Sequence, residues 1–99
     1  MRIGVFTALW GNLSFEEALD RAAAAGGSAV ESGSGGLPGS PHCPVDDLLE
    51  SEAKRGEYME AITSRGLILS SFSCHDNPVH PHAETAKKAD EDFRKSVRL

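Results

Sequence analysis

The residues with the most evident chemistry lie in segment 74–82, which reads Cys-His-Asp-Asn-Pro-Val-His-Pro-His. Histidine and aspartate side chains ligate divalent ions, and histidine also exchanges protons near neutral pH. His75 is the best-placed candidate for contact with a substrate or a metal, because it directly follows an apolar segment. Asn77 is a second candidate for contact with a substrate.

The spacing inside this segment leaves the metal interpretation of His75 weak. Its three histidines stand at positions 75, 80 and 82, a spacing that matches no closed zinc motif. Cys74 has no second cysteine at C-x-x-C spacing. The alternative is a polar loop in which Asp76 and Asn77 make turn hydrogen bonds before Pro78.

Two further side chains stand at the ends of apolar segments. Glu31 follows Gly27-Ser-Ala-Val30, and a lone buried charge is costly, so this carboxylate must meet water or a partner. It is a candidate for holding a polar ligand or positioning a base, and a salt bridge is the alternative. Trp10 ends the first apolar segment, where its ring either stacks against a sugar or packs in the core.

The glycine-rich stretch 33–39 carries neither nucleotide-binding motif. It lacks the lysine and hydroxyl residue that end a P-loop, and Pro38 occupies the third glycine position of the dinucleotide fingerprint. A substrate-covering loop and an ordinary connection both remain as interpretations, because serine and glycine mainly supply turns. His42 and Cys43 follow as a polar pair with no assigned role.

The elements that must position these residues repeat three times along the chain. Short apolar segments predict strands, and amphipathic segments predict helices. Gly26 and Gly66 close the first two helices. The order predicts a parallel βαβαβα arrangement with right-handed crossovers. The expected strands are 2–9, 28–32 and 67–73, and the expected helices are 14–25, 46–65 and 84–99.

Local signals bear on each of the three helices. Ser14 and Glu17 match a capping box at the start of the first helix. Gly56 costs about 1 kcal/mol inside the second helix, so two helices meeting near 51–56 are an alternative. The third helix mixes acidic and basic residues, which is typical of a solvated face.

Loops that follow parallel strands gather at one end of the sheet, so we expect the site there.

Composition narrows the class of protein. The chain has 99 residues and a formal net charge of −5, which argues against a nucleic-acid or anionic-membrane partner. No stretch of about 18 apolar residues is present to span a membrane. The two cysteines predict reduced thiols rather than a disulfide framework, and we expect a cytoplasmic protein.

Four segments of the chain form a recognisable series. They are Arg-Ile-Gly-Val-Phe-Thr-Ala-Leu-Trp from residue 2, Ser-Phe-Glu-Glu-Ala-Leu-Asp-Arg-Ala-Ala-Ala-Ala-Gly from residue 14, Ala-Val-Glu from residue 29, and Ser-Cys-His-Asp-Asn-Pro from residue 73. Together these segments resemble the amino-terminal part of the sugar phosphate isomerase/epimerase family. The resemblance covers essentially the whole chain through the order and spacing of these segments. It implies a xylose isomerase-like TIM barrel, (β/α)8, that moves a proton between adjacent carbons of a ketose or polyol.

The resemblance also implies a divalent metal, Mn, Mg, Zn or Co, held mostly by residues from the later half of the barrel. Glu31 and His75 match the family's site-facing positions after the second and third strands. Ser32 departs from the family's apolar strand residue, and Gly56 interrupts a helix that the family leaves unbroken. Both departures are expected to weaken the local structure.

Residues 1–99 are therefore expected to form a partial barrel domain, the first three βα units of eight, inactive alone. The unpaired edge of the third strand would promote oligomers or aggregation. One alternative is a small non-enzymatic α/β module that binds a ligand or partner and assembles with copies of itself. A third interpretation, an endonuclease IV-like DNA repair fragment, is disfavoured by the acidic charge.

Overall fold

The computed structural model describes residues 1–37 and 39–99, and it contains one three-stranded parallel sheet with the strand order β1-β2-β3. This confirms the predicted α/β class and the parallel order of the strands. Pro38, on which part of the motif argument rested, lies outside the described residues. The strands are β1 (Gly4–Phe6), β2 (Ala29–Gly36) and β3 (Ile68–His75). The helices are η1 (Thr7–Trp10, a 3-10 helix), α1 (Phe15–Ala24), α2 (Val45–Glu50), α3 (Glu52–Thr63) and α4 (Ala83–Arg98).

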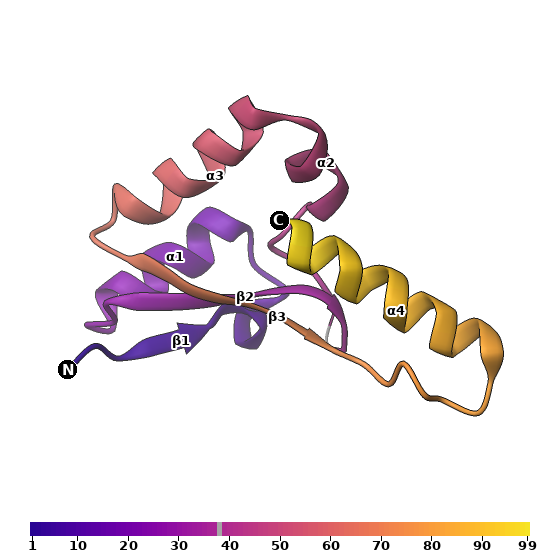
Figure 1. Ribbon diagram of the computed structural model, residues 1–99. Helices are drawn as coiled ribbons and strands as arrows, with labels where there is room; N and C mark the ends of the chain where they lie inside the picture. Colours follow the sequence, from indigo (N-terminus) through magenta and orange to yellow (C-terminus); the bar gives the residue numbers. More distant parts are fainter. Residues whose placement is uncertain (38) are drawn as a thin grey trace.

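The helices pack on one face of the sheet (Figure 1). One buried cluster joins Val30 of β2 to Leu19 of α1, Leu48 of α2 and Ile62 of α3. Successive strand residues point to opposite faces, so the neighbours of Val30 along β2 point away from this cluster. The other face of the sheet is open at the amino-terminal end of β3, where Ile68 is exposed. The sheet thus has one covered and one uncovered face.

The first helix forms as its sequence predicts. The Ser14 side-chain oxygen accepts a hydrogen bond from the Glu17 amide at 3.1 Å, and the Glu17 carboxylate accepts one from the Ser14 amide at 2.9 Å. This is the predicted capping box, which satisfies amides that a helix start leaves unpaired. Gly26, just beyond the helix, adopts φ +83°, a conformation that glycine adopts without strain.

The first strand is shorter than predicted. The expected strand 2–9 pairs with β2 only through Gly4, Val5 and Phe6. Residues 7–10 then form η1. A short apolar run does not distinguish a strand from a helical turn by its pattern alone, which is why the prediction was wrong here.

The second and third strands are longer than predicted. β2 continues beyond the predicted end at Ser32 to Gly36, through residues that were expected to form a loop, and β3 continues to His75. Ser32 is fully buried, and its hydroxyl accepts a hydrogen bond from the Tyr58 hydroxyl at 2.8 Å. Pairing with β3 holds the glycine-rich end of β2 in the sheet, with Gly36 opposite His75. Because this pairing is non-local, the loop prediction was wrong.

The expected helix 46–65 is two helices, as the alternative prediction stated. Ser51 between them is extended, with φ −133° and ψ 113°, and its side-chain oxygen accepts a hydrogen bond from the Lys54 amide. Gly56 lies inside α3, where a side chain at its position would meet no atom within 4 Å. The break between the two helices therefore lies at the capping Ser51 and not at Gly56.

Helix α4 runs back over the carboxyl-terminal halves of β2 and β3 and also contacts α2 (Figure 1). Its Ala89 is buried, whereas Phe93 and Val97 remain 58% and 69% exposed. Leu99, just after the helix, packs against the core cluster. No helix in the described part of the chain combines the length and apolar character needed to cross a membrane.

Candidate functional site

The loops that follow the strands meet at one end of the sheet. β2 and β3 end together, since the Leu37 amide donates a hydrogen bond to the His75 carbonyl oxygen at 2.7 Å. The His42 ring, in the segment after β2, bonds through Nε2 to the Leu13 carbonyl oxygen at 3.0 Å. Because that partner is a carbonyl, Nε2 is the donor. Leu13 follows η1, so this bond ties the first loop to the second.

Of Trp10 and Glu31, only Trp10 follows its strand at this end of the sheet, in η1 directly after β1. Trp10 is half-buried and packs against the core cluster, which agrees with the packing alternative. Glu31 lies inside β2 opposite Ser71, and not at the end of a strand as predicted. The end of β2 at Gly36 lies five positions beyond Glu31, roughly 16 Å at about 3.3 Å per residue.

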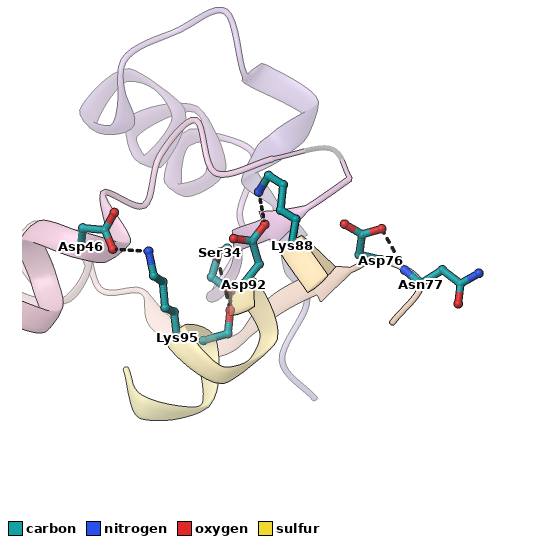
Figure 2. A network of polar contacts seen from close by, with 8 residues as sticks. Ser34, Asp46, Asp76, Asn77, Lys88, Asp92 and Lys95 are labelled. Atoms are coloured by element: carbon teal, nitrogen blue, oxygen red, sulfur yellow. Dashed lines mark hydrogen bonds and ion pairs between the residues drawn. The ribbon is translucent and has the colours of Figure 1, made fainter. Parts of the chain in front are cut away.

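His75 is the last residue of β3, and both its side chain and that of Asn77 are exposed. The Asp76 carboxylate accepts a hydrogen bond from the Asn77 amide at 2.8 Å, and the Asn77 side-chain oxygen accepts one from the Val79 amide at 3.1 Å (Figure 2 shows the first). These bonds match the turn that the sequence analysis offered as the alternative for this segment. Asp76 and Asn77 thus stabilise the loop itself.

The histidine segment does not form a metal centre by itself. Within residues 1–37 and 39–99, no three His, Cys, Asp or Glu side chains are placed to hold a metal ion together. His80 Nδ1 instead accepts a hydrogen bond from the His82 amide at 3.0 Å. The divalent ion that the family resemblance implies therefore does not fit the described residues of this chain alone.

A polar cavity of about 370 Å³, which was not predicted from the sequence, lies beside the end of β2. Segments 34–36 and 39–40 line one side, and segment 43–47 at the start of α2 lines another. Lys88, Asp92 and Lys95 of α4 line a third side. These three residues stand four and three positions apart and so share one face of the helix. The spacing of these three residues was the sequence signal that could have indicated the cavity. The same spacing also fits the solvated helix face that was predicted for this segment.

Two ion pairs border the cavity. Lys95 Nζ lies 2.7 Å from the Asp46 carboxylate, which joins α4 to α2, and Lys88 pairs with Asp92 inside α4 (Figure 2). Hydrogen bonding to Asp92 raises the pKa of Lys88, and hydrogen bonding to Asp46 raises the pKa of Lys95. Both ammonium groups therefore stay charged at neutral pH. The Asp92 side chain is only 18% exposed, so it is the best-shielded carboxylate of the two pairs.

Serine and glycine form the contact between β2 and α4 at this cavity. The hydroxyl oxygens of Ser34 and Ser96 lie 2.6 Å apart, within hydrogen-bond distance. A methyl group on Gly35 would lie 3.0 Å from Asp92 Cβ and 3.3 Å from Cys74 Sγ, closer than an ordinary contact. The glycine therefore allows α4 to approach the strand, which is a structural reason for the glycine-rich stretch.

Neither cysteine is an activated nucleophile. Burial raises the pKa of the Cys43 thiol from 9.0 to about 11. Burial also raises the pKa of the half-buried Cys74 thiol. Both thiols are protonated at neutral pH, and the nucleophile is the thiolate. The chemistry available at this end of the sheet is therefore hydrogen bonding and charge, from carboxylates, ammonium groups, hydroxyls and imidazoles.

These features define a class: a parallel α/β chain with helices on one face of its sheet and a polar cavity beside the carboxyl end of a strand. The chain is similar to a protein of Bacillus subtilis (strain 168) described as "Uncharacterized protein YfiH", with 36% identity over 81 residues. That match includes 82% of this chain but 26% of the relative, so the chain spans about a quarter of the relative's length. No protein-family description matches the chain. No solved structure matches it significantly either.

Proposed function

We propose that this chain forms the first three βα units of a xylose isomerase-like TIM barrel whose complete form isomerises or epimerises a sugar or sugar phosphate. The observation that carries the proposal is the strand order β1-β2-β3, all parallel, with the helices on one face. A barrel grows by adding each strand to the same edge and keeping each helix outside. The first three strands of a doubly wound sheet share this order, and that fold departs from a barrel only from the fourth strand on, where its strand order reverses and helices cover the second face.

The surfaces next to β3 support this reading. A fourth strand would pair with the free edge of β3, and its helix would lie beside α4. Phe93 and Val97 of α4 are exposed there, and exposed apolar patches of this kind mark interaction surfaces. The Bacillus relative, of which the matched residues are 26%, is long enough for further βα units.

The orientation of Glu31 also supports the proposal. Its neighbours Val30 and Ser32 are buried on the helix-covered side of β2. Alternation along the strand therefore directs Glu31 to the open face, which would be the inside of a barrel. In the proposed barrel, Glu31 is a group that binds the substrate or positions a base, and His75 lies at the mouth. We assign no metal-dependent step to this chain, because its described residues do not form a ligand set.

A chimera tests the proposal. The 81 matched residues of the Bacillus relative would be replaced by the corresponding residues of this chain. Turnover would be followed for a panel of ketoses and their phosphates with Mn, Mg, Zn or Co. We expect the relative and the chimera to interconvert one of these sugars, and the 99-residue chain alone to be inactive. Turnover by the isolated chain, or an inactive relative across the whole panel, would contradict the proposal.

A second candidate function is a non-enzymatic module that assembles with copies of itself. The observation that favours it is the same free β3 edge beside the exposed Phe93 and Val97. Size-exclusion chromatography with light scattering distinguishes the two. A monodisperse dimer or trimer with no isomerase activity in the chimera would support self-assembly.

A further inference from the structure

We propose that the cavity between β2, α2 and α4 binds an uncharged polyol, such as a sugar ring or a cyclitol. The cavity volume of about 370 Å³ falls within the range of small-molecule sites, about 300 to 1,000 Å³. The inference does not depend on the proposed barrel, because the cavity would lie outside a barrel's interior.

The position of Ser34 places the cavity outside the interior of the proposed barrel. Val30, Ser32 and Ser34 alternate along the helix-covered side of β2, where they contact the core, Tyr58 and Ser96 respectively. The open face of the sheet, with Glu31, lies on the other side. A ligand in the cavity would therefore contact α4 and the start of α2, and would not reach the reaction centre proposed above.

The charges of the lining select the class of ligand. Three carboxylates and two ammonium groups border the cavity: Asp46, Asp47, Asp92, Lys88 and Lys95. Asp46 and Asp92 already pair with Lys95 and Lys88, and Asp47 pairs with Lys54, so neither a phosphate nor a free cation would meet an unpaired charge of opposite sign. Carboxylates only accept hydrogen bonds and ammonium groups only donate them. A hydroxyl group does both, so a ligand with neighbouring hydroxyls satisfies both kinds of lining group.

The charged side chains that line the cavity are accessible to a ligand. The Lys95–Asp46 pair is exposed, with the Asp46 side chain 72% accessible, and exposed ion pairs contribute only about 0 to 1 kcal/mol. Hydroxyl groups can therefore replace one partner at small cost. Cys43, Pro44 and Val45 supply an apolar wall opposite α4. A sugar ring has carbon-bound hydrogens for such a wall and hydroxyls for the charged side.

Binding is measured by ¹H–¹⁵N NMR titration of the 99-residue chain with myo-inositol and D-fructose. Inorganic phosphate is the anionic probe and glycine is the zwitterionic probe. We expect one of the two polyols to produce saturable shifts at the amides of Gly35, Gly36 and Ser40. We expect no saturable shift at these amides with either charged probe.

Matched variants locate the site. Lys95→Gln and Asp92→Asn each remove one charge from the lining and should weaken polyol binding about tenfold. Lys87→Gln is the control, because Lys87 is on the same helix, outside the cavity, and lies 3.9 Å from Glu91. Ser40→Ala supplies a variant that leaves the ion pairs of α4 intact, and it should weaken binding severalfold even if the Lys95 and Asp92 variants fold poorly.

Three results would overturn the inference. One is the absence of saturable shifts at these amides with both polyols at about 0.1 M, well above a millimolar dissociation constant. Another is saturation by phosphate or glycine in their place. The third is a Lys87→Gln variant that binds as weakly as Lys95→Gln. Each leaves the barrel proposal intact, because the chimera assay measures turnover at a different place.

Discussion

The hydrogen bond between Tyr58 and Ser32 provides the sharpest test of how the sheet is held. The Tyr58 hydroxyl donates to the Ser32 oxygen at 2.8 Å, and both residues are buried. The Tyr58 ring is also stacked on Phe15 at a centroid distance of 4.6 Å, so a phenylalanine would keep the packing. The Tyr58→Phe variant therefore removes this hydrogen bond and the interaction of the hydroxyl with the Cys43 thiol, and it keeps the packing of the ring.

We expect Tyr58→Phe to lower the free energy of unfolding by about 1 to 2 kcal/mol. A net hydrogen bond contributes about 0.5 to 1.5 kcal/mol, and a buried partner left unpaired adds to the cost. For a domain of this size, 1 kcal/mol corresponds to a fall in Tm of about 4 to 8 °C. Urea unfolding followed by circular dichroism measures the change.

The double variant Tyr58→Phe, Ser32→Ala is the control for this prediction. Replacing both partners leaves no buried hydroxyl unpaired, so its loss of stability should be smaller than the sum of the two single losses. We expect a coupling energy of about 1 kcal/mol from the mutant cycle. If the two losses add, or if Tyr58→Phe is neutral, the reasoning that this bond anchors β2 to α3 is refuted.

Three other predictions concern stability. Gly35→Ala should destabilise the fold by about 1 to 3 kcal/mol, because Gly35 has a φ of +149° and the added methyl group would lie 3.0 Å from Asp92 Cβ. Gly56→Ala has open space around it and should stabilise the fold by about 0.5 to 1 kcal/mol in the same urea assay. Ser14→Ala should cost about 1 kcal/mol, measured by urea unfolding, because it removes the cap of α1; an unchanged midpoint would contradict the capping role. Folding raises the pKa of Cys43 from 9.0 to about 11, so the folded state holds the thiol proton more tightly than the unfolded state does. The free energy of unfolding should therefore fall as the pH rises from 9.0 to about 11. The Cys43→Ala variant should flatten this part of the profile of stability against pH.

Local signals predicted the elements that depend on neighbours in sequence. The capping box at Ser14 and the glycine at Gly26 set the bounds of α1 to within one residue, since each acts through bonds or conformations inside one turn. The three parallel strands were also predicted, because buried strands alternate with amphipathic helices. These signals suffice for the class and order of the elements.

Tertiary contacts decided what the sequence did not predict. The Ser32–Gly36 stretch has the composition of a loop, and it is a strand because β3 and Tyr58 supply its partners from far along the chain. The cavity arises only when α4 docks on β2 and α2, which turns Lys88, Asp92 and Lys95 from a solvated stripe into a lining. Glu31 was expected at a strand end, and the same extension of β2 moved it to mid-strand.

The proposed barrel is tested most directly by hydrogen exchange in β3, residues Ile68–His75. In the isolated chain, the β3 amides that point away from β2 pair with no strand among the described residues and should exchange quickly. In the chimera with the Bacillus relative, a fourth strand should pair with this edge and protect those amides by about 100-fold or more, as expected for strands in a stable core. Equal exchange rates of these amides in the isolated chain and in a folded chimera would contradict the barrel.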